Sequence, residues 1–177
     1  MVLAWPWSAA CGLLAAWAEA RARVGDGVEH KRKLSRAERV GNLVAKVLVR
    51  AGVGPNHTHL ITVVGRKTGK PHTTPLTVVE TDGQRWLVAP YGGVAWARNA
   101  RASGSAKLTR GRVTEQVKVE PVDAHESAPV LKAYIRIEPI TRSAFEVGPD
   151  ASLEDFEAIA PKHPVFRVLP VDSGSSA

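Results

Sequence analysis

Residues 65–76 read GRKTGKPHTTPL and combine several side chains that can bind an anion. Arg66, Lys67 and Lys70 place three cations within five residues, and the threonines add hydroxyl donors. The two glycines let the backbone expose N–H groups, so the stretch can hold a phosphate or a carboxylate through charge-assisted hydrogen bonds. Its spacing is neither that of a Walker A loop nor that of a dinucleotide fingerprint. A solvated basic hairpin is the alternative at this point.

A second stretch, residues 88–99, reads VAPYGGVAWARN and runs from a predicted strand through a Gly-Gly turn into a predicted helix. The first N–H groups of a helix have no partner within it, so its start can bind an anion. Tyr91 and Trp96 can form the sides of a slot for a flat ring. The alternative for Trp96 is core packing, which is the commoner role of a buried tryptophan.

The elements that must position these stretches are short strands with helices before and after them. Runs of β-branched residues predict strands over 60–64, 73–80 and 85–90, with the hairpin signal Asp82-Gly83 between the last two. The other predicted elements are strands over 106–109, 113–119 and 164–171 and helices over 35–52, 94–102, 123–137 and 152–161. This order indicates an α+β fold built on an antiparallel sheet or a small barrel.

Length and charge limit the possible partners. The 177 residues suffice for one domain, which we expect to span 35–172, followed by a disordered tail over 173–177. The net charge is +7; residues 55–120 carry ten Lys/Arg against four Asp/Glu, and residues 121–177 carry five against nine. Such a distribution favours an anionic partner, namely nucleic acid, anionic lipid or a phosphorylated small molecule. No nucleic-acid-binding signature accompanies the basic residues, so we expect no nucleic acid.

The remaining features indicate where in the cell the protein resides and whether it binds a metal ion. Residues 1–18 carry no charge and barely reach the length of a membrane-spanning helix. We therefore expect residues 1–34 to be peripheral or disordered, with weak membrane association as the alternative. The lone Cys11 excludes an internal disulfide and suits a cytoplasmic protein. We expect no metal, because no neighbouring Asp, Glu or Cys completes a site around His57 and His59.

Taken together, GRKTGKPHTTPL at 65–76, YGGVAWARNARASG at 91–104 and APKHPVFRVLP at 160–170 resemble the deazaflavin-dependent nitroreductase family of actinobacteria. The resemblance covers roughly residues 57–170. It implies an antiparallel split β-barrel of the FMN-binding type, flanked by helices. It also implies coenzyme F420, a deazaflavin with a phosphate and an oligoglutamate tail, as the cofactor.

The resemblance also implies which residues contact F420. Those assigned to the phosphate and tail are Arg66, Lys67, Thr68, Gly69 and Lys70. Those assigned to the ring and the head of the cofactor are Thr73, Thr74, Pro75, Leu76, Ala89, Pro90, Tyr91, Gly92, Gly93, Trp96 and Asn99.

The implied reaction is hydride transfer from reduced deazaflavin to an electron-poor small molecule: a quinone, a nitro compound or an activated double bond. The redox chemistry then belongs to the cofactor, and the protein orients it. We hypothesise that Tyr134 faces the substrate and assists protonation, with simple packing of its helix as the alternative. Two other functions stay open: a non-catalytic binding module for deazaflavin, FMN or haem, and a basic nucleic-acid or lipid binder. A homodimer is expected only by analogy with other split barrels.

Overall fold

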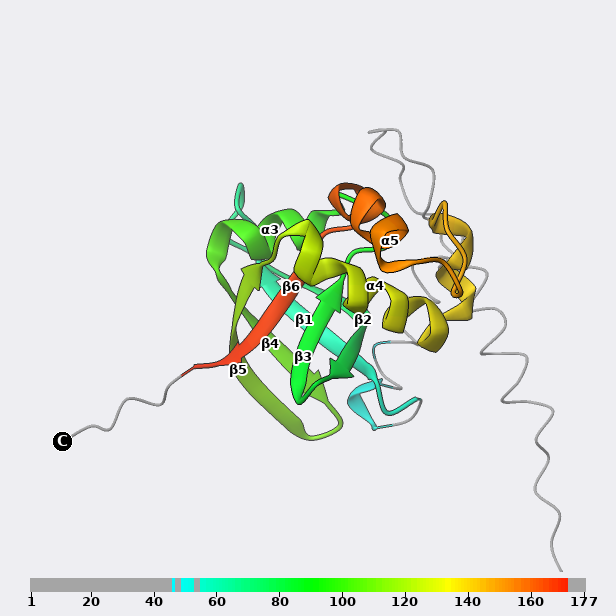
Figure 1. Cartoon of the computed structure of the whole chain (residues 1–177). Coiled ribbons are helices and arrows are strands. Elements are labelled where there is room, and N and C mark those ends of the chain that lie inside the picture. Colours follow the sequence, from blue (N-terminus) through cyan, green and yellow to red (C-terminus); the bar gives the residue numbers. More distant parts are fainter. Residues whose placement is uncertain (1–45, 47–48, 53–54, 172–177) are drawn as a thin grey trace, which may run out of the picture.

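The computed structural model describes residues 46, 49–52 and 55–171, and within them six strands form one closed barrel. Neighbouring strands are antiparallel throughout, in the order β1-β2-β3-β6-β5-β4. The strands are β1 (Thr58–Val64), β2 (Pro71–Thr81), β3 (Gln84–Val88), β4 (Ser105–Arg110), β5 (Val113–Pro121) and β6 (Val165–Pro170). The predicted antiparallel barrel with flanking helices is confirmed (Figure 1).

Tight turns set the register of the hairpins. At the β2–β3 turn Asp82 and Gly83 have φ values of 52° and 70°, as a type I′ turn requires at both central positions. The Asp-Gly signal therefore produced the predicted hairpin. The β4–β5 turn similarly contains Gly111 with a φ of 57°.

The pairing places both sequence stretches at one end of the barrel. Because β1, β2 and β3 alternate in direction, loop 65–70 and segment 89–94 leave the sheet at the same end. Helix α3 (Ala95–Ser103) follows segment 89–94 and lies at this end (Figure 1). Val88 pairs with Val165, so the residues that precede β6 arrive there too. We call this end the α3 end of the barrel.

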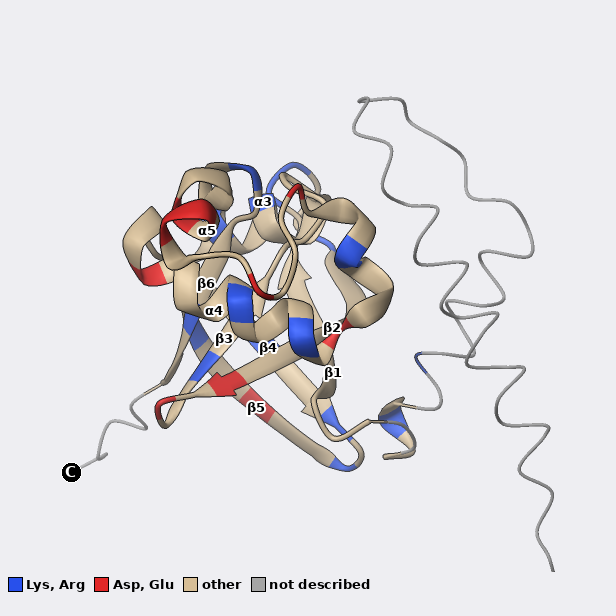
Figure 2. Cartoon of the chain, turned by 45° about the vertical axis from the view of Figure 1, so that its right-hand side comes forward, with Lys and Arg blue, Asp and Glu red and all other residues tan. Residues whose placement is uncertain are grey.

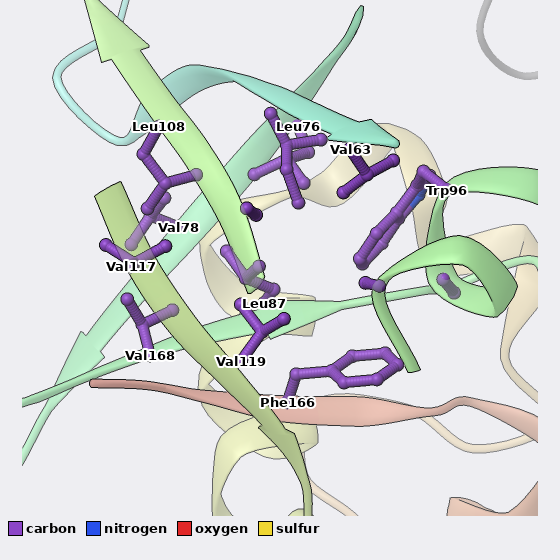
Figure 3. Packing of buried hydrophobic residues seen from close by; sticks show 14 of the residues in the cluster. Val63, Leu76, Val78, Leu87, Trp96, Leu108, Val117, Val119, Phe166 and Val168 are labelled. Carbon is purple, nitrogen blue, oxygen red and sulfur yellow. The ribbon is translucent and has the colours of Figure 1, made fainter. Parts of the chain in front are cut away.

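The barrel interior and one face of α3 form a single hydrophobic core. Trp96, Ala97 and Ala100 of α3 pack with the inward side chains of the strands. Figure 3 shows Trp96 pointing into this interior near Phe166, and their ring centroids are 5.8 Å apart. Each large side chain buried in this way contributes roughly 1.5–3 kcal/mol. Helix α3 is thus held at the end of the barrel by the core itself.

A second core lies outside the barrel, beneath helix α4 (Ala124–Ile137), helix α5 (Leu153–Ile159) and the 3₁₀ helices η1 (Pro139–Ala144) and η2 (Ala160–Lys162). Local capping fixes where the two α-helices begin. The Asp123 side chain accepts a hydrogen bond from the Glu126 N–H at 2.8 Å, and Ser152 and Asp155 form a reciprocal capping box. Both starts agree with the sequence-based expectation.

Other expectations lie partly or wholly outside the described residues. The segments 1–34 and 173–177 and most of the predicted helix over 35–52 belong to this group. Within that helix, residues 49–50 are helical and Gly52 follows with a φ of 77°, as expected for its end. The short helix η1 was not predicted. Among the described helices, none combines the length and the apolar character needed to cross a bilayer.

Candidate functional site

Main-chain hydrogen bonds close loop 65–70 between β1 and β2. The Gly65 N–H donates to the Lys70 carbonyl at 2.8 Å, and the Thr68 and Gly69 N–H groups donate to the Gly65 carbonyl at 3.2 and 2.8 Å. Gly69 has a φ of 66°, which favours glycine at this position. The loop is therefore a compact turn, and its three cationic side chains are exposed.

Asn99 of α3 attaches this loop to the barrel. Its Oδ1 accepts hydrogen bonds from the backbone N–H of Arg66 at 3.3 Å and from Arg66 Nη1 at 3.2 Å. Asn99 is 6% exposed, and a buried polar group left without partners costs about 1–3 kcal/mol. Asn99, which we expected beside the cofactor ring, thus has its amide oxygen engaged by the loop. The structure brings the two sequence stretches together through this residue.

Loop 65–70 and helix α3, both at the α3 end of the barrel, are strongly cationic. Among the described residues, no ion pair joins the arginine or the lysines of loop 65–70 to a carboxylate. Residues 83–114 contain no Asp or Glu, and α3 adds the exposed Arg98 and Arg101. Figure 2 shows basic residues around α3. This unbalanced positive charge favours an anionic ligand at this end. Sequence reasoning missed both α3 arginines, although their spacing on the helix is the signal that indicates a shared face.

Residues just before β6 hold segment 89–94 in place. The Ala89 N–H donates to the Pro164 carbonyl at 2.9 Å, and the Pro90 carbonyl lies 2.7 Å from Nδ1 of His163. We expected this segment to offer backbone groups to the cofactor. In the structure the Ala89 N–H and the Pro90 carbonyl already have protein partners, and the Ala89 side chain is buried in the barrel core.

The turn into α3 has one tight glycine and one open glycine. Gly92 donates its N–H to the Ala89 carbonyl at 3.1 Å, and its carbonyl accepts from the Val94 N–H at 2.7 Å. It has a φ of 72°, and an added Cβ would lie 3.1 Å from the Lys162 carbonyl oxygen. A Cβ on Gly93 would meet nothing within 4 Å. Helix α3 also begins without a side-chain cap. Gly93 and the start of the helix are therefore the part of this turn that other side chains leave uncovered.

The four residues predicted to line the ring divide between two faces of β2. Leu76 is 3% exposed and lies in the barrel core, so Thr74, two residues earlier, shares its inward side. Thr73 and Pro75 face the outside and are half-buried. The Thr73 hydroxyl lies 2.8 Å from the hydroxyl of Thr62 on the neighbouring strand β1. Only Thr73 and Pro75 of the four therefore lie on the outer surface.

The aromatic residues of the predicted site also separate. Trp96 is 8% exposed and packs in the barrel core, whereas Tyr91 is half-buried in the turn before α3. Tyr134 is 1% exposed and lies in the outer core, with its ring centroid 6.0 Å from that of Phe145. This burial favours the packing interpretation of Tyr134, and its role in protonation stays a prediction.

His163 is a buried residue at the α3 end that sequence reasoning did not single out. It is 4% exposed, and its ring stacks on Phe145 with centroids 4.3 Å apart. Burial lowers the pKa of His163, and its hydrogen bond to Pro90 acts in the opposite direction. The motif APKHPVFRVLP contained this residue, but nothing in the sequence indicates that it touches segment 89–94.

The histidine pair near the start of β1 has structural contacts. His57 Nε2 lies 3.4 Å from the Glu138 carboxylate, and His59 Nδ1 lies 3.3 Å from the His57 carbonyl. Burial lowers the pKa of His59. The described residues contain no group of three or more His, Cys, Asp or Glu side chains that could hold a metal ion.

Fold and site together define an antiparallel barrel with a cationic loop and a cationic helix at one end. Residues 35–142 match the model of the F420H(2)-dependent quinone reductase family, which is more than half of the chain. The chain therefore belongs to this family and is an F420-dependent oxidoreductase, as the motif resemblance implied.

Several solved structures are similar to this chain. One is an F420-H2-dependent reductase, FDR-A, with 22% identity, a TM-score of 0.45, and coverage of 64% of this chain and 94% of that one. Another is a putative pyridoxamine 5′-phosphate oxidase from Listeria innocua, with 12% identity, a TM-score of 0.45, and coverage of 72% and 93%. A third is an FAD-binding protein from Mesorhizobium loti, with 16% identity, a TM-score of 0.43, and coverage of 78% and 91%. These likenesses are too distant to bear on function.

Proposed function

We propose that the chain reduces a quinone-type acceptor with reduced F420 and that loop 65–70 binds the anionic part of the cofactor. The family match supports the cofactor and the class of acceptor. The main support for this binding site comes from the loop itself. Its cations have no carboxylate partner among the described residues, and Asn99 attaches the loop to α3. A multiply charged anion satisfies such a set of donors.

In this proposal Arg66, Lys67 and Lys70 bind the phosphate and the carboxylates of the tail. Thr68 and Gly69 shape the turn, since the Thr68 hydroxyl accepts from the Lys70 N–H at 3.4 Å and Gly69 adopts the positive φ. A hydrogen bond to a charged group contributes about 1.5–3 kcal/mol, and exposure to solvent reduces this value. Affinity should therefore fall as salt concentration rises.

The flat ring is proposed to lie on the outer surface of β2, where Thr73 and Pro75 are half-buried, and to extend toward the open turn at Gly93. Tyr91, in the same turn, is proposed to contact the head of the cofactor. Bound reduced F420 supplies the hydride, and the residues of the chain hold it and the acceptor in position. Trp96, Leu76 and Ala89 support this surface from the barrel core rather than touching the ring.

Two measurements test this function. Titration of the protein with F420, FMN and haem should show tightest binding of F420. Addition of menadione to F420H2 with a catalytic amount of protein should then restore the absorbance of oxidised F420 over many turnovers. Binding with no more than one turnover would instead support a non-catalytic module. Equal affinity for FMN, or for generic polyanions such as heparin, would contradict the proposed cofactor site.

A further inference from the structure

The contact between His163 and Pro90 specifies where the imidazole carries its proton. Nδ1 of His163 lies 2.7 Å from the Pro90 carbonyl oxygen. A carbonyl oxygen can only accept a hydrogen bond, so Nδ1 must be the donor and carries hydrogen. In the neutral ring the other nitrogen, Nε2, then has a lone pair and no hydrogen.

The surroundings of Nε2 favour this neutral form. Nε2 is buried and has no hydrogen-bond partner within the described part of the chain. A proton on Nε2 would create a buried N–H donor without an acceptor, which costs about 1–3 kcal/mol. Burial accordingly lowers the pKa of His163. The charged groups that act on it are Glu146 and Lys162, which pair with each other at 2.5 and 2.7 Å.

His163 belongs to a segment, residues 162–164, that contacts the turn before α3 at three consecutive positions. The Lys162 carbonyl lies against Gly92, His163 bonds to Pro90, and the Pro164 carbonyl accepts the Ala89 N–H. The contact at Pro90 is the only one of the three made by a side chain, so it alone can be removed or titrated without altering the backbone of segment 162–164.

We propose that His163, as the neutral tautomer protonated at Nδ1, is a positioning residue that holds Pro90 and the following glycine turn in the conformation that receives F420. This inference rests on the proposed function, because it assigns the turn at Gly93 to the cofactor surface. It requires that loss of the Nδ1 donor, or protonation of Nε2, loosens the turn and weakens F420 binding.

Two substitutions separate the donor from the bulk of the ring. His163→Asn places an amide N–H close to the position of Nδ1, whereas His163→Leu keeps an apolar side chain of similar size and has no donor. At pH 7.5 the F420 dissociation constant should rise about tenfold or more in His163→Leu and stay within about threefold of the wild type in His163→Asn. A tenfold change corresponds to about 1.4 kcal/mol. Similar affinity of His163→Leu and wild type would overturn the proposal.

Measurements without cofactor distinguish this proposal from the proposed function. The ¹⁵N shifts of His163 should report the neutral Nδ1–H tautomer at pH 7.5, and a neutral ring protonated at Nε2 would refute it. In His163→Leu, hydrogen exchange at the Gly92 amide should accelerate at least tenfold, whereas the Leu108 amide in the barrel core should be unchanged. Equal acceleration at both would mean general destabilisation and would refute positioning. If the wild type binds no F420, the proposed function fails, and these two measurements still decide the role of His163.

The pH profile supplies the last test. Between pH 8 and pH 5, the F420 affinity of the wild type should weaken more steeply than that of His163→Asn. The variant has no imidazole at position 163, so any pH dependence that it shows comes from the ligand or from other groups of the protein. Parallel profiles would contradict a role for Nε2 protonation. If His163→Leu does not fold, the tautomer and the His163→Asn comparison still test the proposal.

Discussion

Replacing Asn99 by aspartate would separate the two contributions of loop 65–70, its position and its charge. Asn99 Oδ1 accepts from the Arg66 N–H and from Arg66 Nη1 at 3.3 and 3.2 Å. An aspartate carboxylate keeps both acceptor positions and adds a negative charge beside the guanidinium. The loop should therefore stay attached to α3 while the positive field that attracts the cofactor is reduced by one charge.

The expected magnitude follows from losing about one charge-assisted contact. Discounted for solvent exposure, such a contact contributes roughly 1.4 kcal/mol, so the F420 dissociation constant should rise about tenfold in Asn99→Asp. The thermal midpoint should change by less than about 4 °C, because the pairing with Arg66 offsets the cost of burying the charge. Asn99→Leu, the matched control, keeps the cations but removes the acceptor, and it should lower the midpoint as well as the affinity.

Fluorescence titration of F420 at low and high salt measures this effect. The difference between wild type and Asn99→Asp should shrink as salt rises, because the lost interaction is electrostatic. Arg112→Ala removes an exposed cation from the β4–β5 turn at the opposite end of the barrel and should leave the affinity unchanged. If Asn99→Asp binds F420 as the wild type does, or if Arg112→Ala loses as much affinity, the anion site does not lie on loop 65–70.

Three further predictions follow from individual residues. Gly92→Ala should lower the free energy of unfolding by about 1–3 kcal/mol because of its φ of 72° and the Lys162 carbonyl at 3.1 Å, whereas Gly93→Ala should leave it within about 0.5 kcal/mol. Urea unfolding measures both, and equal stability of the two variants would show that the turn tolerates a side chain at Gly92. Tyr134→Phe should keep at least half of the menadione turnover because the tyrosine ring packs in the outer core. A more than tenfold loss of turnover, without a matching loss of stability, would instead support a role of Tyr134 in protonation. The free energy of unfolding should decrease as pH falls below about 6.5, because burial lowers the pKa of His59 and the unfolded chain then binds more protons. Urea unfolding of His59→Gln should give a shallower dependence on pH, and an unchanged slope would exclude this histidine as a source.

The elements that sequence reasoning located correctly depend on local signals. Asp82-Gly83 specifies its turn through two positive φ values, and the capping pairs that begin α4 and α5 need only residues three positions apart. The alternation of β2 was also readable, since side chains two residues apart share a face. It places Leu76 on the opposite face from Thr73 and Pro75, and the structure shows Leu76 in the barrel core. The assignment of all four residues of that run to the cofactor ring stays a prediction.

The parts that sequence reasoning missed depend on contacts between distant segments. Arg66 and Asn99 are 33 positions apart, and His163 and Pro90 are 73 apart, so neither pairing leaves a local pattern. All four residues lie in the stretches that carry the motif resemblance, but the resemblance does not say which of their atoms already have partners within the protein. The resemblance therefore indicated the correct family and cofactor. Which of the motif residues are buried in the core or bonded to another segment required the three-dimensional arrangement.

Helix α3 connects the loop to the core, and this has a consequence for binding kinetics. Trp96 and Ala100 fix the helix within the barrel, and Asn99, between them in sequence, fixes the loop to the helix. The entropy of ordering the loop is thus lost when the chain folds and not when the ligand arrives. Association with a dianionic or polyanionic molecule should then approach the rate of a steered encounter between two rigid partners, without a slow isomerisation afterwards.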